Sequence, residues 1–504
     1  MILLDGRSLT LEDLVAIARD HEPVAIAGAA RDRVSAARAI VEAAAARPAP
    51  TYGINTGFGD FAEVVIPPGS LGPLQVNLLR SHAAGVGEPL PIPAVRATMA
   101  LRANVLAKGF SGIRLDTLDL LVEMLNRRVH PVVPSRGSVG ASGDLAPLAH
   151  LALVLIGEGT AWVGDAQEPG AEALGRAGLV PAVLGPKEGL ALINGTQASG
   201  AVLGLALADA GRLARAADIA AALSIDALRG STRPFDARIH AARGFQGQQD
   251  SAGNLRTLLA GSAINASHAD CGRVQDAYSM RCVPQVHGAA REALTFIRRV
   301  AETEANAATD NPMVFADTGE ILSGGNFHGA PIGIAADLLC VAVAQIATIS
   351  ERRCERLVNP ALSGLPAFLT RHGGLQSGLM MAQVTAAALT SELKAVAHPA
   401  SVDTIPTSAG REDHVSMSMA AALKAARAVE LARQVVACEL LCACEAIDLL
   451  APLRSSAPLV AVHDFIRTRV PIVDHDRSVS LDLRVISDMI VSGGVERASG
   501  VKVN

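Results

Sequence analysis

The run from Gly137 to His150 constrains this chain most, because small residues bracket one serine, Ser142, directly before a predicted helix. Glycines on both sides of Ala141-Ser142 remove Cβ atoms that would prevent the backbone from curling tightly. The Gly143 amide nitrogen could then approach the Ala141 carbonyl carbon. Closure with loss of water, including the Ser142 hydroxyl, would leave a five-membered ring carrying an exocyclic methylene. The run therefore allows the chain to make a covalent electrophile from itself.

The same run also fits a Gly-rich connection into a helix from Leu145, with Asp144 favouring the positive end of the helix dipole. Two other kinds of site fit poorly. Asp144 stands two residues after Ser142, where a nucleophile elbow requires glycine. No lysine follows the glycines, as a phosphate-binding loop requires.

Composition favours closely packed helices. Half of the 504 residues are apolar but only 3% are aromatic, so Ala, Leu and Val must build the core. The length exceeds one ordinary core, which predicts either two domains or one domain continued by an elongated bundle. Several predicted helices are apolar on most faces, and self-association is the simplest way to cover them.

The charge pattern excludes several partners. The net charge is -5 without long basic runs, so neither nucleic acid nor an anionic membrane is an expected partner. Met1–Asp5 lacks the features of a secretory signal, which favours a cytoplasmic protein. The longest charge-free runs, 189–208 and 372–391, contain Asn and Gln among small residues and suit buried helices better than membrane spans. A small-molecule substrate is expected.

All seven cysteines lie between Cys271 and Cys444, an odd number that predicts reduced thiols rather than a disulfide framework. Cys438, Cys442 and Cys444 fall on one apparent helix. A metal site there lacks nearby histidines, so buried small hydrophobic residues are the preferred interpretation and no metal is expected.

The predicted fold class is mainly α, with an N-terminal mixed α/β globular part over residues 1–196 and a long central helical bundle over residues 197–504. Short elements alternate in the first part, where Thr10-Leu11-Glu12-Asp13 is a helix-start signal. Strands are expected at 24–26 and 160–163, and helices at 32–47, 74–81, 93–108 and 115–128. Long helices are expected at 292–309, 335–357, 380–396 and 415–450.

Both tyrosines of the chain, Tyr52 and Tyr278, lie in polar segments rather than in apolar helices. Tyr52 opens the glycine-containing segment 52–59, which suits a mobile, tightly folded loop. His82, at a helix end, would by itself be interpreted as a capping cation. Asn194, by itself, would be interpreted as a helix N-cap.

Together these segments resemble the histidine and aromatic amino acid ammonia-lyases. The similarity extends from about Tyr52 to Met417 with the motifs in family order. The matching segments are Tyr52-Gly53-Ile54-Asn55-Thr56-Gly57-Phe58-Gly59, Ser81-His82-Ala83-Ala84-Gly85-Val86-Gly87, Ala141-Ser142-Gly143, Ile193-Asn194-Gly195-Thr196-Gln197, Gln275-Asp276-Ala277-Tyr278-Ser279-Met280-Arg281-Cys282, Asn326-Phe327-His328-Gly329 and Glu412-Asp413-His414-Val415-Ser416-Met417.

The resemblance implies that Ala141-Ser142-Gly143 cyclises to a 4-methylidene-imidazol-5-one (MIO) group. It implies catalytic roles for Tyr52, as the base that takes the β-proton, and for Tyr278. It also implies a homotetramer whose active sites are shared between subunits. The implied substrate-binding residues are His82, Asn194, Gln275, Arg281, Phe327 and Glu412, and three-residue spacing is compatible with one helical face for Gln275, Tyr278 and Arg281.

Capture of the substrate amine and capture of its ring by the methylene both remain open. In either route Tyr52, with a reference pKa of about 10, needs positive potential such as helix N-termini to approach the phenolate.

Histidine is the predicted substrate and trans-urocanate the predicted product. His82 cannot decide, because tyrosine lyases of the family also carry histidine there. Glu412 discriminates better, since a buried carboxylate is left unpaired beside a phenyl ring and satisfied by an imidazole N–H. Departures from the family pattern at Gly410, Arg411, Ala330 and Ala277 put substrate fit in question.

A tyrosine or phenylalanine lyase and an MIO aminomutase remain alternatives. An aspartase/fumarase-type lyase is disfavoured, because the Gly-Ser-Ser-rich loop of that class is absent from this sequence. A non-catalytic helical scaffold leaves the polar setting of both tyrosines unexplained.

Overall fold

The computed structural model describes residues 1–164, 166–269, 272 and 274–504, so Cys271 lies outside the described part of the chain. Close contacts group the chain into two units, each built from three segments. The first unit comprises residues 1–208, 298–337 and 399–423. The second comprises residues 209–297, 338–398 and 424–504.

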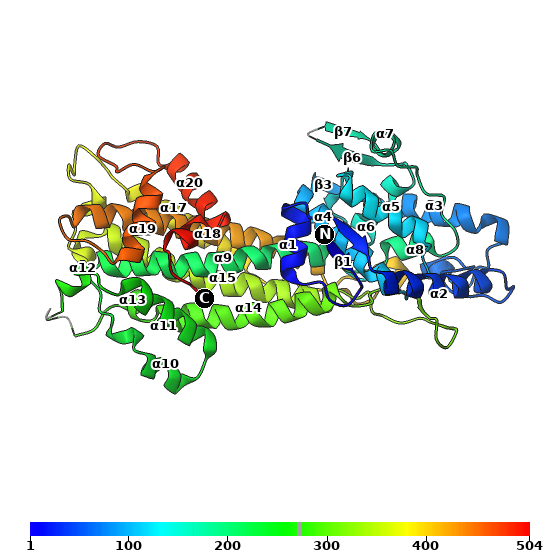
Figure 1. Ribbon diagram of the computed structural model, residues 1–504, viewed down its shortest axis with the longest axis horizontal. Coiled ribbons are helices and arrows are strands. Elements are labelled where there is room, and N and C mark those ends of the chain that lie inside the picture. The colour runs from blue at the N-terminus through cyan, green and yellow to red at the C-terminus, as the bar shows by residue number, and fades with distance from the viewer. Residues whose placement is uncertain (165, 270–271, 273) are drawn as a thin grey trace. The chain divides into compact units, whose positions relative to one another are not determined.

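The first unit is a mixed α/β assembly of short elements around α4 and α6 (Figure 1). Its helices are α1 (Leu11–Arg19), α2 (Gly28–Ala45), α3 (Leu71–His82), α4 (Ile92–Ala107), α5 (Leu115–Asn126), α6 (Leu145–Leu155), α7 (Gly170–Arg176) and α8 (Glu188–Ile193), with 3-10 turns η1 (Gly59–Phe61), η2 (Pro68–Ser70) and η5 (Ser408–Gly410). Its strands are β1 (Ile2–Leu4), β2 (Val24–Ile26), β3 (Val86–Pro89), β4 (His130–Pro131), β5 (Pro134–Arg136), β6 (Thr160–Val163), β7 (Ala166–Pro169), β8 (Met313–Phe315) and β9 (Glu320–Leu322).

The sheets of this unit are small. Strands β1 and β2 pair in parallel with Leu3 opposite Ala25, and β4, β6 and β7 form a three-stranded antiparallel sheet. Strands β3 and β5 pair antiparallel with a register shift, and β8 and β9 form a hairpin-like antiparallel pair. The start signal at Thr10 is a complete capping box with Asp13. The short sheets lie beside buried helices instead of forming the core.

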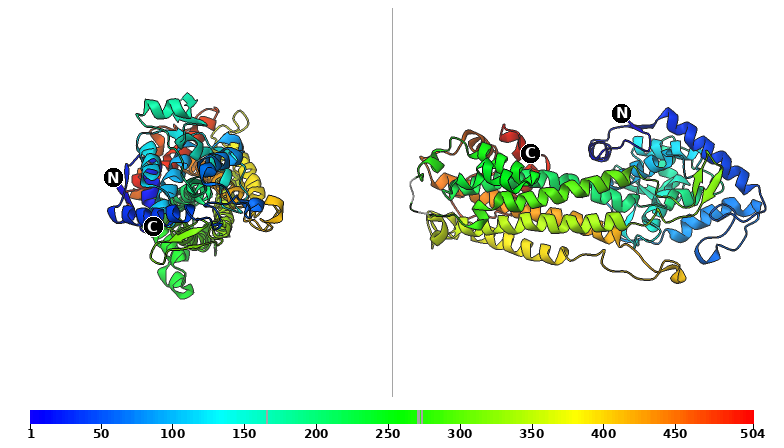
Figure 2. Two further views of the ribbon diagram at one scale, coloured as in Figure 1. Left: turned by 90° about the vertical axis from the view of Figure 1, so that its right-hand side faces the viewer. Right: turned by 90° about the horizontal axis from the view of Figure 1, so that it is seen from below.

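The second unit consists of long helices that run alongside one another, with shorter helices added at their sides (Figure 2). The long helices are α9 (Gln197–Ala227), α14 (Val283–Ala305), α15 (Ala330–Val358), α17 (Met380–Val396) and α18 (Ser418–Leu449), and α9, α14, α15 and α18 each have one end in the first unit. The shorter elements are η3 (Arg233–Phe235), α10 (Ala237–Arg243), α11 (Gln246–Leu259), α12 (Ala263–Ala266), α13 (Tyr278–Arg281), α16 (Pro360–Ser363), η4 (Ala367–Leu369), α19 (Ala457–Arg467), α20 (Ser480–Val491) and α21 (Gly494–Ala498).

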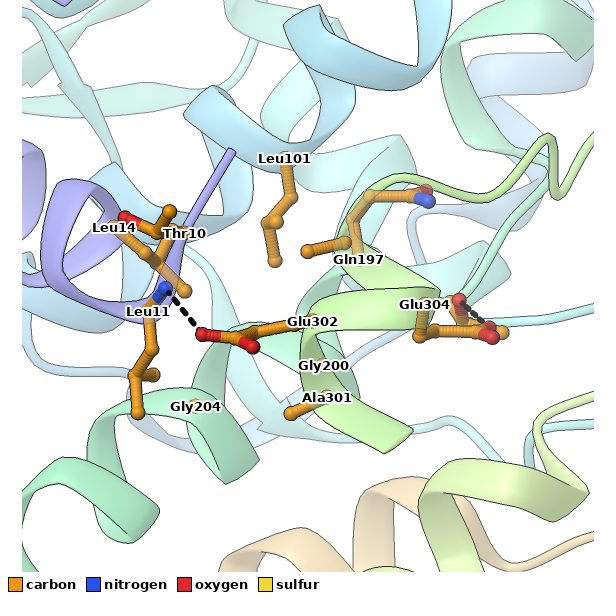
Figure 3. A pocket seen from close by; sticks show the side chains of 12 residues that line it. Thr10, Leu11, Leu14, Leu101, Gln197, Gly200, Gly204, Ala301, Glu302 and Glu304 are labelled. Atoms are coloured by element: carbon orange, nitrogen blue, oxygen red, sulfur yellow. Dashed lines mark hydrogen bonds between the residues drawn. The ribbon is translucent and has the colours of Figure 1, made fainter. Parts of the chain in front are cut away.

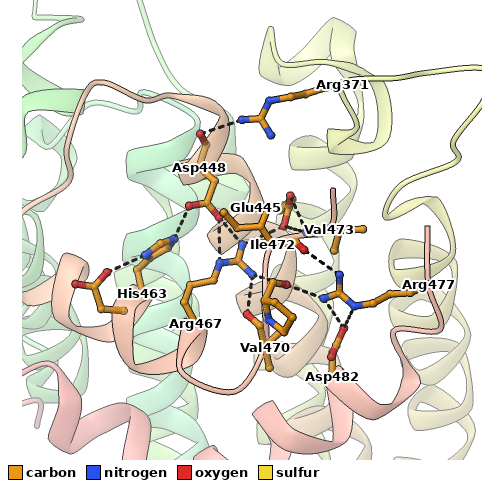
Figure 4. A network of polar contacts seen from close by, with 12 residues as sticks. Arg371, Glu445, Asp448, His463, Arg467, Val470, Ile472, Val473, Arg477 and Asp482 are labelled. Carbon is orange, nitrogen blue, oxygen red and sulfur yellow. Dashed lines mark hydrogen bonds and ion pairs between the residues drawn. The ribbon is translucent and has the colours of Figure 1, made fainter. Parts of the chain in front are cut away.

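A polar network ties the C-terminal helices to α18 (Figure 4). Arg467 of α19 pairs with Glu445 at 3.0 Å and Asp448 at 2.5 Å. His463 lies 2.9 Å from the other Asp448 oxygen. Burial lowers the pKa of His463, but the bonds to Asp448 outweigh it and leave that pKa raised. The network holds α19 against the last turns of α18.

The predicted fold class, mainly α with mixed short elements before the long helices, is confirmed. The strands expected at 24–26 and 160–163 and the helix at 380–396 have the predicted bounds. Helix α14 begins nine residues before the predicted start at 292 and ends before Thr309. Cys438, Cys442 and Cys444 are buried, and burial raises the pKa of Cys444 to about 12.

Within the described residues, α15 is the one helix long and apolar enough to cross a membrane, and 67% of its most apolar window is buried.

Candidate active site

Ala141, Ser142 and Gly143 lie in the connection between β5 and α6, where two glycines have no room for a side chain. Gly143 has φ +74°, and a Cβ there would lie 2.2 Å from the Gly195 carbonyl oxygen. Gly140 has φ +70°, and a Cβ there would lie 2.2 Å from the Ser416 hydroxyl. Left-handed backbone combined with such contacts permits only glycine. Glycine is therefore required on both sides of Ala141-Ser142, and closure of the ring stays a prediction.

The turn that joins α8 to α9 holds the C-terminal side of this tripeptide. The Asn194 side-chain amide donates a 2.9 Å hydrogen bond to the Ser142 carbonyl oxygen. The Asp144 backbone N–H donates a 2.7 Å hydrogen bond to the Gly195 carbonyl. Asn194 closes the C-terminal end of α8 and therefore is not the N-cap that it resembles in sequence.

Asp144 precedes α6 but its side chain makes no capping bond to that helix, contrary to the simple interpretation of the sequence. Its carboxylate instead accepts hydrogen bonds from the Ser199 backbone N–H and hydroxyl at 2.7 and 2.8 Å, and from the Ser138 hydroxyl at 2.9 Å. Burial raises the pKa of Asp144 although these bonds oppose the shift. Asp144 thus ties the tripeptide loop to α9.

The Glu412 carboxylate faces the tripeptide. One oxygen accepts a 2.5 Å hydrogen bond from the Ser142 hydroxyl. The other accepts bonds from the hydroxyls of Thr407 at 2.6 Å and Ser408 at 2.9 Å. Burial alone raises the pKa of Glu412, but these hydroxyls and the nearby His82 outweigh burial and leave the pKa below its usual value. Glu412 is therefore an ionised acceptor at neutral pH.

Tyr52 lies half-buried in the loop before η1, with its ring edge-on to Phe58 at a centroid distance of 6.5 Å. Burial raises the pKa of Tyr52, the Glu412 charge raises it further, and a hydrogen bond from the Gly59 backbone opposes both. Among these causes no positive charge lowers the pKa of Tyr52, so the positive potential expected to assist its phenolate stays a prediction.

His82 ends α3, and its Nδ1 lies 2.9 Å from the Leu78 carbonyl oxygen and 3.0 Å from the Ser81 hydroxyl. This nitrogen has the helix-capping position that the sequence favoured for an isolated histidine. The ring is nevertheless close enough to Glu412 to influence its pKa electrostatically.

Phe327 is half-buried on a turn that packs against the tripeptide loop. The Gly329 N–H donates a 3.2 Å bond to the Gly140 carbonyl. The imidazole of His328 stacks on that of His414 with centroids 5.7 Å apart and planes 5° from parallel. Phe327 is therefore connected to the segment that carries Glu412.

Gln275, Tyr278 and Arg281 belong to the second unit. Their three-residue spacing is compatible with one helical face, but α13 begins at Tyr278, and Gln275 precedes it in irregular backbone. The Ser231 N–H donates a 2.6 Å bond to the Asp276 carboxylate at this point. Tyr278 and Arg281 do share a face, with the guanidinium carbon 4.7 Å from the ring centroid.

The departures from the family pattern have definite positions. Arg411 points to Asp60 at 3.5 Å, and 59% of its side chain is exposed. It therefore does not neutralise Glu412. Ala330 begins α15, Gly410 has φ +84°, and Ala277 is the N-cap residue of α13.

Several site residues carry no sequence signal of their own. Thr407 and Ser408 are hydroxyl donors in a polar loop, and Ser199 sits in an Ala-rich helix. Thr196 and Gln197 help to line a small cavity of about 20 Å³ (Figure 3). Glu304 borders it and accepts a 2.6 Å bond from the Thr196 hydroxyl. Within the described ranges no group of three or more His, Cys, Asp or Glu side chains is arranged to hold a metal.

Residues 9–468 match the family model described as aromatic amino acid lyase. A histidine ammonia-lyase from Anaeromyxobacter sp. (strain K) is 58% identical over 504 residues, covering 98% of this chain and 99% of that protein. The chain belongs to the aromatic amino acid lyase family. This confirms the family predicted from the motifs and the enzyme class, a lyase.

Solved structures of the lyase's relatives have the same fold. The histidine ammonia-lyase from Trypanosoma cruzi superimposes with a TM-score of 0.93 at 44% identity, covering 99% of this chain and 95% of that one. The tyrosine aminomutase from Streptomyces globisporus superimposes with a TM-score of 0.95 at 36% identity, with full coverage of both chains. The fold alone therefore does not separate lyases from aminomutases.

Proposed function

We propose that this lyase eliminates ammonia from L-histidine to give trans-urocanate. The observation that carries the proposal is the Glu412 carboxylate, which hydroxyl donors keep ionised and which lies at hydrogen-bond distance from Ser142. An imidazole N–H satisfies this acceptor, whereas the phenyl ring of phenylalanine leaves it unpaired at a cost of about 1–3 kcal/mol. The 58% identical histidine ammonia-lyase supports the same substrate.

We further propose that Ala141-Ser142-Gly143 forms the MIO group, and the local contacts fit it. The left-handed Gly143 accepts no side chain, and the Ser142 carbonyl already has a donor in Asn194. The Asn194 side-chain oxygen is buried without a hydrogen-bond partner. When formed, the group supplies an electrophile that activates the substrate for loss of ammonia.

The remaining steps belong to the chain's own side chains. Glu412 accepts the imidazole N–H, and His82 supplies a second polar group near that carboxylate. Tyr52 takes the β-proton from the substrate, while Phe327 packs against the substrate. A general base contributes about 10²–10⁴-fold to a rate of this kind.

Gln275, Tyr278 and Arg281 are proposed to complete the site of another subunit in a homotetramer. Tyr278 is 70% exposed, and the Arg281 Nε is buried without a hydrogen-bond partner. Arg281 provides a planar fork suited to the substrate carboxylate. The mass of the assembly by light scattering tests this arrangement, and a monomer with full activity overturns it. A cytoplasmic location and a domain division at residue 196 are further proposals.

Incubating the purified protein separately with histidine, tyrosine and phenylalanine, and following urocanate, coumarate and cinnamate absorbance, tests the substrate. Urocanate formation is expected with histidine. Coumarate or cinnamate without urocanate overturns the histidine assignment. The fold shared with a tyrosine aminomutase makes a β-amino acid product the alternative outcome, and chromatography of the products detects it.

A further inference from the structure

Arg102 of α4 is a fully buried arginine whose hydrogen-bond partners are all neutral. Its Nη1 donates to the Asn194 carbonyl at 2.8 Å and to the Gln197 side-chain oxygen at 2.6 Å. Its Nη2 donates to the Ala191 carbonyl. Burial lowers the pKa of Arg102 to about 10, so the guanidinium is still charged at neutral pH. The charge of Asp310 opposes this shift from a distance, but no carboxylate accepts a hydrogen bond from Arg102. Burying a charge whose hydrogen-bond acceptors are all neutral is costly, and such a residue needs an explanation.

The three acceptors belong to residues 191–197, which comprise the end of α8, the connecting turn that holds the Ala-Ser-Gly tripeptide and the first residue of α9. This segment is called the 191–197 turn below. Two bonds from this turn reach the tripeptide region, one from the Asn194 amide to the Ser142 carbonyl and one to the Gly195 carbonyl from the Asp144 N–H. These two bonds fix the backbone on both sides of the Gly143 nitrogen. Arg102 therefore contacts the segment that holds the backbone around the Gly143 nitrogen.

We propose that Arg102 is a positioning residue for formation of the prosthetic ring. It fixes the 191–197 turn, so that Asn194 and Gly195 hold the backbone on both sides of Gly143 in the curled conformation needed for closure. The inference rests on the proposed function, because it concerns the ring that the proposed reaction uses.

The covalent change balances without a further reactant. A bond forms between the Gly143 nitrogen and the Ala141 carbonyl carbon, and the Ala141 carbonyl oxygen leaves as water with the amide hydrogens of Gly143 and Ser142. The Ser142 hydroxyl leaves as a second water with the Ser142 α-hydrogen. No electrons are gained or lost. Arg102 takes no part in the bonds that form or break, because its contacts are with the turn.

The planar guanidinium explains why arginine, and not lysine, suits position 102. One guanidinium reaches three oxygens in fixed directions, whereas the ammonium of a lysine is a compact charge on a flexible stem. The fit is close, since a Cβ on Gly195 would lie 2.6 Å from Arg102 Nη1. Replacement by lysine keeps the charge and removes the simultaneous contacts.

Arg96 provides a matched control on the same helix. It is 1% exposed, burial lowers its pKa to about 10, and it donates to the Ile17 and Leu125 carbonyls and to His130. Its partners lie in α1, α5 and β4, away from the tripeptide turn. Arg96→Lys therefore removes a buried arginine fork of the same kind without touching the turn.

The experiment measures the intact mass of full-length wild-type protein, Arg102→Lys and Arg96→Lys, with melting temperatures for all three. The expected result is a wild-type chain and an Arg96→Lys chain lighter by two waters. The ring-containing fraction of folded Arg102→Lys is expected to fall at least tenfold. A folded Arg102→Lys that is completely lighter by two waters overturns the inference.

Gln197→Leu covers the case in which Arg102→Lys does not fold. It removes one acceptor and leaves Arg102 in place, so a reduced ring-containing fraction at unchanged secondary structure supports the inference. Complete ring formation in Gln197→Leu overturns it in that case. A wild-type chain with its full unprocessed mass is a separate outcome that contradicts the proposed function itself.

Discussion

The Ser142 hydroxyl donates a 2.5 Å hydrogen bond to the Glu412 carboxylate, across 270 residues of sequence. In the proposed reaction, the hydroxyl that ring formation would remove is the one that occupies this carboxylate. Loss of the hydroxyl leaves that Glu412 oxygen available to a substrate N–H, while Thr407 and Ser408 still hold the other oxygen. This relationship connects ring formation with substrate recognition.

Glu412→Gln is expected to lower kcat/KM for histidine about 10- to 100-fold, because a hydrogen bond to a charged group contributes about 1.5–3 kcal/mol. Intact mass distinguishes a recognition defect from a failure to form the ring. Unchanged kcat/KM in a ring-containing variant shows that another residue binds the imidazole.

Arg411→Gln is expected to change KM for histidine less than about twofold, because the exposed pair with Asp60 contributes about 0–1 kcal/mol. Asp60→Asn should behave in the same way. A tenfold change in KM, or turnover of a different amino acid by Arg411→Gln, places the guanidinium in the pocket.

Tyr52→Phe is expected to retain the ring and the fold but to lose about 10²–10⁴-fold in turnover. Because burial raises the pKa of Tyr52, the phenolate fraction grows about tenfold per pH unit below that pKa. Wild-type turnover should therefore rise between pH 7 and pH 9. A flat pH profile together with an active Tyr52→Phe variant assigns the base elsewhere.

Helices and strands could be predicted from the sequence where the residues at their ends give strong start or stop signals. Strand β2 and helix α17 have the predicted bounds, and the capping box at Thr10 forms as the residues indicate. The chemistry-bearing tripeptide could be found because glycine on both sides of Ala141-Ser142 is a local property. The motifs also sufficed to identify the family.

Long-range partners could not be predicted. Asp144 resembles a helix cap, but its carboxylate bonds Ser199, 55 residues further along the chain. Gln275 falls outside α13, because the backbone is extended at Ala277, and the neighbouring Asp276 carboxylate accepts a bond from the distant Ser231 N–H. A single division point along the sequence also could not show that residues 399–423 belong to the first unit. Each of these depends on tertiary contacts that periodicity does not record.

The buried His130 is expected to make the stability of the first unit sensitive to acid. Burial, followed by the charge of Arg96, lowers the pKa of His130 to about 3 from 6.5. Between these values the unfolded chain binds a proton that the folded chain does not, so stability falls as pH falls below 6.5. From pH 7 to pH 5 this group costs about 2 kcal/mol.

His130→Gln, which retains an acceptor for Arg96, should lose about 2 kcal/mol less of its unfolding free energy over this range. Denaturant unfolding of both proteins at pH 7 and pH 5 measures the difference. An identical pH dependence in the two proteins assigns the acid sensitivity to other groups.

The mass of the purified wild-type chain tests the central claim most directly, together with that of Ser142→Ala. A wild-type chain lighter than its sequence by two waters is expected, with peptide mapping placing the loss at Ala141-Ser142-Gly143. The Ser142→Ala chain should fold, lack the exocyclic methylene and form no urocanate. A wild-type chain with its full sequence mass that nevertheless converts histidine to urocanate contradicts the account.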